Sequence, residues 1–380
     1  MNKAIRWGFW GTGAIAHSVA SDFRLADGAV LHAVASRTEE RARRFALEYG
    51  VAKWYGGLDP LLNDAEVEVV YIATPNHRHV DDCITCIEAG KAVLCEKPFA
   101  LNLAQARRIV DAARRRKVFC MEAMWTRFVP AMIEATRCIH AGAIGPIRLI
   151  QGNFAFPSSA ESNPRLFDTE MGGGALLDLG VYLISLAHQL LGLPQSISGT
   201  TRLGATGVDE QSAYQLLYAN GALADLWASL QVRGTNEVVI FGERGMLRLC
   251  EPFYCAYRFI VQPLAGPQAV KQGGLPPGPA GLRKIVEAVR KAPAAKSLRR
   301  RLTSVLSVLE RDRVQTFPFP GNGYQFELME VNRCLREERT ESAIMPLQDS
   351  LDVMQTMDAL RSQWGLVYPQ EQSGRQQNAI

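Results

Sequence analysis

The stretch "WGFWGTGAIA", from Trp7 to Ala16, joins an apolar run to a segment with helical spacing. It contains the pattern GxGxxA, with Gly11, Gly13 and Ala16 at its fixed positions. Gly11 permits a tight turn, Gly13 lets a pyrophosphate approach the backbone, and Ala16 allows close packing of the helix. Because a helix N-terminus attracts anions, the stretch predicts a dinucleotide site, with a purely structural turn as the alternative. The residues expected to contact the dinucleotide are Gly11, Thr12, Gly13, Ala14 and Ile15.

The segments around this turn predict two domains. Up to residue 123, apolar runs alternate with helical patterns, which is typical of an α/β Rossmann domain with a covered parallel sheet. From about residue 146, strand-like runs follow one another, which predicts an α+β domain over 124–380 on a large, mostly antiparallel sheet. Helices are expected at about Tyr324–Arg336 and Leu347–Trp364, packing back on the first domain. Residues 265–312 form a basic insertion, with helices predicted at Arg283–Lys291 and Leu298–Arg311.

Composition excludes several classes of protein. The 380 residues are 47% hydrophobic and 21% charged, which is typical of an ordinary globular protein. No apolar run is long enough to predict a membrane span, and a net charge of +4 is too small to predict nucleic-acid binding. Of the eight cysteines, only Cys83 and Cys86 form a CxxC pair. We therefore expect core or half-buried thiols in a reducing cytoplasm and no metal site.

The end of the second predicted strand bears on the choice of dinucleotide. An NAD site usually carries Asp or Glu about 20 residues after the glycine turn, where it binds the ribose 2′-hydroxyl. Here the strand "AVLHAVAS" ends in Ser36 and Arg37, and Arg41 follows one turn later. An acidic residue would repel a 2′-phosphate, whereas arginine binds it in a forked geometry. The sequence therefore favours NADP over NAD.

Two further features predict a reactive cleft. Parallel strands end in "TPNH" at 74–77 and in "EKP" at 96–98, and ligands of such sheets lie at these carboxyl ends. A lysine before proline has a restricted backbone, so Lys97 is expected to point into the cleft. In "GGGALLDLGVYLISLAHQL", residues 172–190, Asp178 and Tyr182 stand four apart on one helix face. That face is either catalytic or part of the core with two satisfied polar groups.

Together, the GxGxxA turn, "TPNH", "EKP" and "GGGALLDLGVY" resemble the glucose–fructose oxidoreductase / inositol dehydrogenase (Gfo/Idh/MocA) family. "CMEAMWTRFVPA" and "ATGVDEQ" are similar to its dimeric dihydrodiol dehydrogenase and D-xylose dehydrogenase branch. The resemblance implies a Rossmann domain followed by a large open-faced sheet, which often pairs in a homodimer. It also implies hydride transfer between NADP and a carbinol or carbonyl carbon of a sugar or cyclic diol.

The resemblance also implies roles for single residues. Tyr182 matches the acid/base, at a position where many members carry His. Lys97 matches the lysine that assists it, and a lysine ammonium near a phenol lowers the phenol's pKa. Asp178 is expected to bind substrate hydroxyls or Lys97. Because sugars and cyclic diols stack on aromatic rings, Trp125 and Phe154 are expected either to wall the substrate pocket or to belong to the core. Further residues expected along the cofactor are Thr74, Pro75, Asn76, His79, Glu96, Lys97, Trp125 and Arg127.

A rival hypothesis is a cofactor-binding regulator or scaffold of the same fold without turnover. Such a protein should keep the glycine turn and lose the acid/base pair. Because Lys97, Asp178 and Tyr182 are all present, the sequence favours the enzyme. The basic insertion is the best support for the rival. The insertion can also be interpreted as a solvated segment, an oligomer contact or a contact with an anionic surface.

Overall fold

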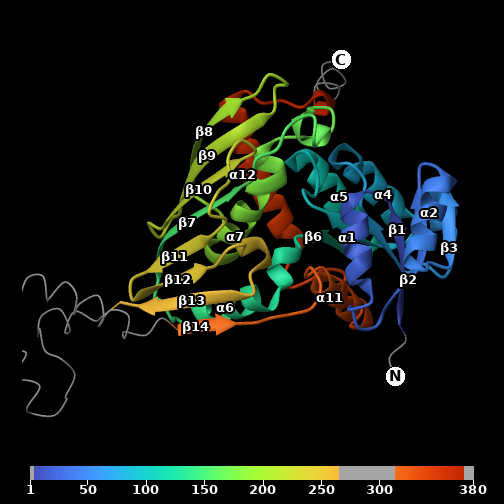
Figure 1. Cartoon of the computed structure of the whole chain (residues 1–380), viewed down its shortest axis with the longest axis horizontal. Helices are drawn as coiled ribbons and strands as arrows, with labels where there is room; N and C mark the ends of the chain where they lie inside the picture. The colour runs from blue at the N-terminus through green and yellow to red at the C-terminus, as the bar shows by residue number, and fades with distance from the viewer. Residues whose placement is uncertain (1–3, 265–312, 372–380) are drawn as a thin grey trace, which may run out of the picture.

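The computed structural model describes residues 4–264 and 313–371, and contains two sheets that form opposite sides of the molecule (Figure 1). The basic insertion and its two predicted helices lie outside the described residues. Among the described residues, no helix is both long and apolar enough to span a membrane. The predicted combination of an α/β Rossmann domain with a mostly antiparallel second sheet is confirmed.

The first sheet is parallel, with strand order β3-β2-β1-β4-β5-β6. This is the order in which two βαβαβ halves meet at β1 and β4, where a crevice opens at the carboxyl ends of the strands. The strands at its centre are almost entirely buried because helices cover both faces. The strands are β1 (Ile5–Trp10), β2 (Ala29–Ser36), β3 (Lys53–Gly56), β4 (Val69–Ile72), β5 (Ala92–Glu96) and β6 (Cys120–Ala123).

The second sheet has eight strands in the order β14-β13-β12-β11-β7-β10-β9-β8. All neighbouring strands are antiparallel except β7 and β10, which run parallel. Burial alternates along β9, which indicates one covered face and one open face. The strands are β7 (Ile147–Ala155), β8 (Ser196–Leu203), β9 (Asp209–Leu217), β10 (Leu223–Ser229), β11 (Val238–Gly242), β12 (Gly245–Leu249), β13 (Arg258–Pro263) and β14 (Arg313–Thr316).

Helices fill the space between the two sheets. α7 and α12 cover the inner face of the second sheet, and α12 also packs on α5 and β6 of the first (Figure 1). α11 packs on α1 and β2, so both C-terminal helices touch the first sheet's layer. The α-helices are α1 (Ala14–Phe23), α2 (Glu39–Tyr49), α3 (Leu58–Leu62), α4 (His79–Glu88), α5 (Leu103–Arg116), α6 (Pro130–His140), α7 (Val181–Leu191), α11 (Gln325–Arg336) and α12 (Leu347–Trp364).

Several elements were not anticipated from the sequence. The short β3 and α3, the helix α6, the strand β13 and the edge strand β14 carry patterns too brief or too mixed to predict. The stretch 172–190 is not one uniform helix, because a π-helical turn over Leu176–Gly180 precedes α7. All eight cysteines are free thiols, and Cys83 and Cys86 of the CxxC pair are buried in the core, as expected.

Candidate active site

A cavity of about 1070 Å³ opens at the carboxyl ends of β1, β2, β4 and β5 and extends toward α7. The glycine turn and the end of β2 line one part of it, and Lys97, Asp178 and Tyr182 line another. The cavity therefore joins the predicted dinucleotide turn to the predicted catalytic group. It contains every residue predicted from the glycine turn and from the end of β2: Gly11, Thr12, Gly13, Ala14, Ile15, Ser36, Arg37 and Arg41.

The glycine turn has the backbone that a phosphate site requires. Gly11 has φ of 111°, and a Cβ there would lie 2.6 Å from the carbonyl oxygen of Ala73. A Cβ on Gly13 would meet no atom of the described residues within 4 Å, so the space beside it is open in this part of the structure. Gly13 caps the N-terminus of α1, and no described side chain caps that helix end. Open backbone N–H groups at a helix N-terminus fit a pyrophosphate.

The residues that line the cavity at the end of β2 are hydrogen-bond donors, and none of them is acidic. Ser36 Oγ lies 3.2 Å from Thr12 Oγ1, which ties the strand end to the glycine turn. Arg37 and Arg41 line the cavity, and among the described residues neither forms a hydrogen bond or an ion pair. Two unpaired guanidinium groups beside a hydroxyl fit a phosphate ester.

The ends of β4 and β5 form the middle of the cavity. Thr74, Pro75 and Asn76 line it after β4, and Asn76 donates a hydrogen bond to the carbonyl of Gly172, 3.0 Å away. Glu96 lines it at the end of β5. The peptide bond between Lys97 and Pro98 is cis.

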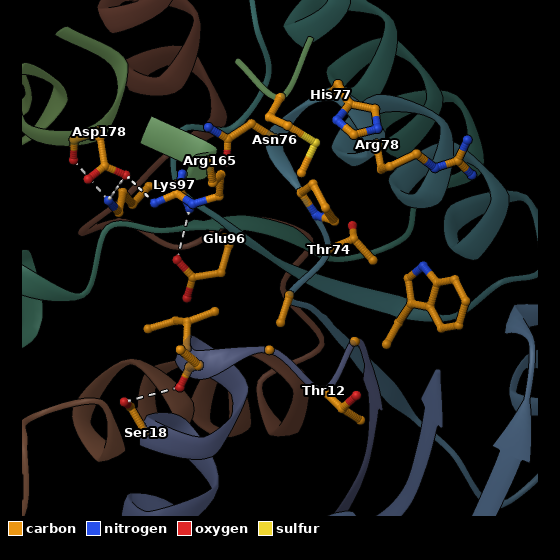
Figure 2. A pocket seen from close by; sticks show the side chains of 18 of the residues that line it. Thr12, Ser18, Thr74, Asn76, His77, Arg78, Glu96, Lys97, Arg165 and Asp178 are labelled. Atoms are coloured by element: carbon orange, nitrogen blue, oxygen red, sulfur yellow. Dashed lines mark hydrogen bonds and ion pairs between the residues drawn. The ribbon is translucent and has the colours of Figure 1, made fainter. Parts of the chain in front are cut away.

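Lys97 and Arg165 converge on Asp178 (Figure 2). Lys97 Nζ donates to the backbone carbonyl oxygen of Asp178 at 2.9 Å and lies 3.6 Å from Oδ1. Arg165 donates to Oδ1 at 2.9 Å. Burial alone would raise the pKa of Asp178, but the two cations outweigh it and hold that pKa below its ordinary value. Asp178 is therefore a carboxylate near neutral pH.

The loop before α7 is held by a second buried carboxyl. Gly174 has φ of 119°, and a Cβ there would overlap Oδ1 of Asp209. Asp209 Oδ2 accepts a bond of 2.7 Å from the amide of Leu176, the first residue of the π turn. The third glycine of "GGG" is thus required because the loop backbone lies close to the carboxyl group of Asp209. π turns inside helices occur frequently at functional sites, and this one carries Asp178.

Tyr182 lies in an aromatic wall of the cavity. Its hydroxyl accepts a hydrogen bond of 3.1 Å from Trp125 Nε1, and its ring packs edge-on against Phe154 with centroids 5.3 Å apart. Phe154 in turn stacks on Tyr254 at 4.4 Å, and Trp125 packs on Tyr324 at 4.6 Å. These rings and Lys97 leave an apolar pocket with few polar groups.

The relation between Lys97 and Tyr182 differs from the expectation. Lys97 Nζ lies 4.7 Å from the centroid of the Tyr182 ring, over its face, because Asp178 holds the ammonium group. Burial, followed by the charge of Glu96, raises the pKa of Tyr182 well above its ordinary value. In this arrangement the phenol is neutral, because burial outweighs the groups that lower its pKa.

Two predicted cofactor residues lie outside the cavity lining. His79 is fully buried between the carbonyl oxygens of Pro98 and Thr74, each 2.9 Å from a ring nitrogen. Arg127 is 2% exposed and is held by Asp349 at 2.5 Å and by Ser185. Each side chain is held by buried groups behind the cavity lining, and the predicted contact of both with the cofactor stays a prediction.

Sequence reasoning missed several residues that line the cavity, and five of them are aromatic or polar residues that follow residue 124. These five stand in loops or at element ends without a periodic pattern, and only Arg165 carries a charge. The alternation of aromatic residues in "FAF" and the cluster "FYC" were the only available signals. The residues are Phe156, Asn163, Arg165, Tyr254 and Tyr324.

Comparison with known proteins identifies the family. Residues 5–124 match the model described as "Oxidoreductase family, NAD-binding Rossmann fold", and residues 132–248 match the Gfo/Idh/MocA C-terminal domain. The chain is 32% identical to the pig trans-1,2-dihydrobenzene-1,2-diol dehydrogenase over 374 residues, covering 97% of this chain and 99% of the relative. The human protein of that name is 32% identical over 381 residues, with the same coverage.

Solved structures show the same fold. A 3-ketoreductase from Actinomadura kijaniata, in complex with NADP and TDP-benzene, has a TM-score of 0.75 at 23% identity, covering 95% of this chain and 98% of its own. An aldose-aldose oxidoreductase from Caulobacter crescentus, complexed with glycerol, has a TM-score of 0.74 at 22% identity, covering 94% and 96%. The two family models and the curated relatives confirm the predicted family. The chain belongs to the Gfo/Idh/MocA oxidoreductases and is an NAD(P)-dependent dehydrogenase or reductase.

Proposed function

We propose that this protein transfers a hydride between C4 of the nicotinamide of NADP and a carbinol or carbonyl carbon of a sugar or cyclic diol. The observation that carries the proposal is one continuous cavity joining the open glycine turn to Lys97, Asp178 and Tyr182. The names of the relatives agree with this substrate class, because they include a dihydrodiol dehydrogenase and sugar oxidoreductases.

The preference for NADP rests on the end of β2. Ser36, Arg37 and Arg41 offer a hydroxyl and two unpaired guanidinium groups where an NAD site would present a carboxylate. The glycine turn and the N-terminus of α1 would hold the pyrophosphate, and Thr74, Asn76 and Glu96 would lie along the rest of the cofactor. When bound, the cofactor supplies or accepts the hydride.

The side chains of this chain supply the proton. In the reductive direction the neutral phenol of Tyr182 donates its proton to the substrate oxygen as charge develops there, and the hydrogen bond from Trp125 Nε1 stabilises the phenolate that remains. Lys97 donates a hydrogen bond to the same oxygen. Asp178 accepts bonds from neighbouring substrate hydroxyls and keeps Lys97 in the cavity. In the oxidative direction the same proton path runs backward, after the phenol has lost its proton.

The aromatic wall favours a ligand with an apolar ring face. Trp125, Phe154 and Tyr254 present ring surfaces, and sugars and cyclic diols stack such faces on aromatic side chains. The predicted roles of Trp125 and Phe154 as substrate contacts are therefore kept in this proposal. Tyr254 and Tyr324 join them.

A panel of substrates tests the reaction. The purified protein is incubated with NADPH and, separately, NADP+, against aldoses, ketoses, cyclic diketones and trans-dihydrodiols, and absorbance at the nicotinamide band is followed. We expect turnover with at least one member and a lower kcat/KM when NAD(H) replaces NADP(H). Tight NADPH binding without turnover on any member would favour the regulator hypothesis instead.

We also infer that two copies pair through the open face of the second sheet. Leu217 of β9 and Leu223 of β10 are cross-strand neighbours that are 39% and 45% exposed, so they form an apolar patch on that face. Sedimentation velocity of the full chain measures this directly. A dimer that becomes monomeric in L223E supports the inference, and a wild-type monomer at micromolar concentration contradicts it.

A further inference from the structure

A buried carboxyl group outside the cavity lining belongs to α11. Glu327 is in the first turn of α11 and is 0% exposed. Within the described part of the chain, neither of its carboxyl oxygens has a hydrogen-bond partner. An ionised carboxylate in this setting would be a buried charge without compensation, which proteins avoid by protonating the group.

The charged group that acts most strongly on Glu327 is Glu96, which lines the cavity at the end of β5. Glu96 Oε1 accepts a hydrogen bond of 2.5 Å from the Tyr71 hydroxyl, and Oε2 accepts one of 3.2 Å from the amide of Lys97. Burial raises the pKa of Glu96 too, but Glu96 has two donors that suit a carboxylate, whereas Glu327 has none among the described residues. Two carboxyl groups that share one buried site cannot both ionise easily, so one of them holds a proton.

The surrounding groups agree with this division. The titratable or charged groups that face the pair are Tyr71 on β4, His79 on α4, Lys97 after β5, Tyr182 on α7 and Tyr324 before α11. Burial lowers the pKa of His79, against the two carbonyl oxygens that face its ring nitrogens, and the Lys97 ammonium is bound to Asp178. Burial, followed by the charge of Glu96, raises the pKa of Glu327 well above its ordinary value.

We propose that Glu96 and Glu327 form a single proton-binding site in the cavity wall, in which Glu327 carries the proton at neutral pH and Glu96 is the carboxylate. Glu327 is a positioning residue in this account, because it acts on the cavity through Glu96. Its proton keeps the charge of the pair at one negative unit beside Tyr182.

This proton site has a consequence that rests on the proposed function. The oxidised nicotinamide is positively charged and the reduced one is neutral, so binding of NADP+ favours the loss of a proton from a neighbouring acid. The O–H bond of Glu327 then breaks, and the proton passes to the solvent. Binding of NADPH does not favour this release. The pair thus links the charge of the bound cofactor to the release of a proton.

The first experiment needs no cofactor and no turnover. Infrared difference spectra of the wild type against Glu327→Gln are recorded at pH 7, with Glu337→Gln, an exposed glutamate at the end of the same helix, as the matched control. We expect a protonated-carboxyl C=O band in the wild type that E327Q lacks and E337Q keeps. Protonated Asp209, whose pKa burial raises to about 7, cancels in the difference. A difference spectrum without this band would overturn the proposal.

If E327Q does not fold, carboxyl 13C spectra of glutamate-labelled wild type decide the matter. One glutamate carboxyl resonance should have the chemical shift of a protonated carboxyl group at pH 7. The absence of any such resonance would overturn the proposal. The link to the cofactor is tested by calorimetry of NADP+ and NADPH binding in two buffers with different ionisation enthalpies. The wild type should release more protons with NADP+ than with NADPH, and E327Q should show no such difference. Equal release by wild type and E327Q would refute the link and leave the hydride-transfer proposal standing.

Discussion

Replacing Arg37 by alanine should weaken NADP+ binding and leave NAD+ binding unchanged. Arg37 follows β2 at the mouth of the cavity, and among the described residues its guanidinium has no hydrogen bond or ion pair to lose. The change therefore removes a contact with the ligand and no contact within the described protein. A hydrogen bond to a charged group contributes about 1.5–3 kcal/mol, and an exposed site falls at the lower end of that range.

This reasoning predicts a loss of about 1.5 kcal/mol, or roughly a tenfold rise in the Kd of NADP+. The double variant R37A/R41A should lose about a hundredfold if the two contacts are independent. Titration calorimetry with NADP+ and NAD+ measures both effects at fixed salt. The matched control is Arg43→Ala, which changes an exposed arginine of α2 that does not line the cavity. Equal weakening of NADP+ and NAD+, or a wild type that binds NAD+ more tightly, would refute the assignment.

Three other substitutions probe the surroundings of the cavity. Arg165→Met removes one of the two cations that lower the pKa of Asp178, so the acid limb of the kcat/KM profile should move to higher pH, and an unshifted limb would show that Arg165 does not act on Asp178. Asp209→Asn removes a carboxyl whose folded pKa of about 7 exceeds its ordinary 3.8. Because the folded state holds the proton of Asp209 more tightly than the unfolded state does, the stabilisation is complete at low pH and is lost as the pH rises through about 7. Between about pH 4 and pH 7 the free energy of unfolding of the wild type should therefore fall by about 4 kcal/mol relative to that of D209N. Parallel pH curves in urea denaturation would contradict this. Arg127→Met leaves Asp349 unpaired and should cost about 3–5 kcal/mol in the same assay, with the Kd of NADPH unchanged in the folded fraction. A changed Kd would instead make Arg127 a cofactor contact.

The fold and half of the candidate site could be predicted because their signals are local in the sequence. The glycine turn, the end of β2 and the Lys97-Pro98 dipeptide each carry their chemistry within a few residues. Asp178 and Tyr182 were visible as polar residues in an apolar helix. The groups that these two residues contact could not be predicted. The π turn that offers the Asp178 carbonyl to Lys97 depends on Asp209, thirty-odd residues further along the chain.

The other half of the site comes from pairs that are distant in sequence. Arg165 reaches Asp178 from a loop, and Glu327 reaches Glu96 from the far end of the chain. Burial also reversed one expectation. A lysine near a phenol was expected to lower its pKa, but Asp178 holds Lys97 over the ring face, and desolvation raises the pKa of Tyr182. Such effects depend on which groups lose water on folding, and the sequence alone does not show that.

The central claim is that the Tyr182 hydroxyl moves the proton in the hydride-transfer reaction. Its most direct test is the single-turnover rate of NADPH oxidation by Tyr182→Phe on a substrate that the wild type reduces. Tyr218→Phe is the matched control, because Tyr218 is also buried, lies outside the cavity lining and has a hydroxyl without a partner among the described residues. General acid catalysis contributes about 10²–10⁴-fold to the rate, so Y182F should be slower by that factor. Y182F should still bind NADPH as the wild type does, and Y218F should keep the full rate. A Y182F enzyme that oxidises NADPH at the wild-type rate would contradict the account.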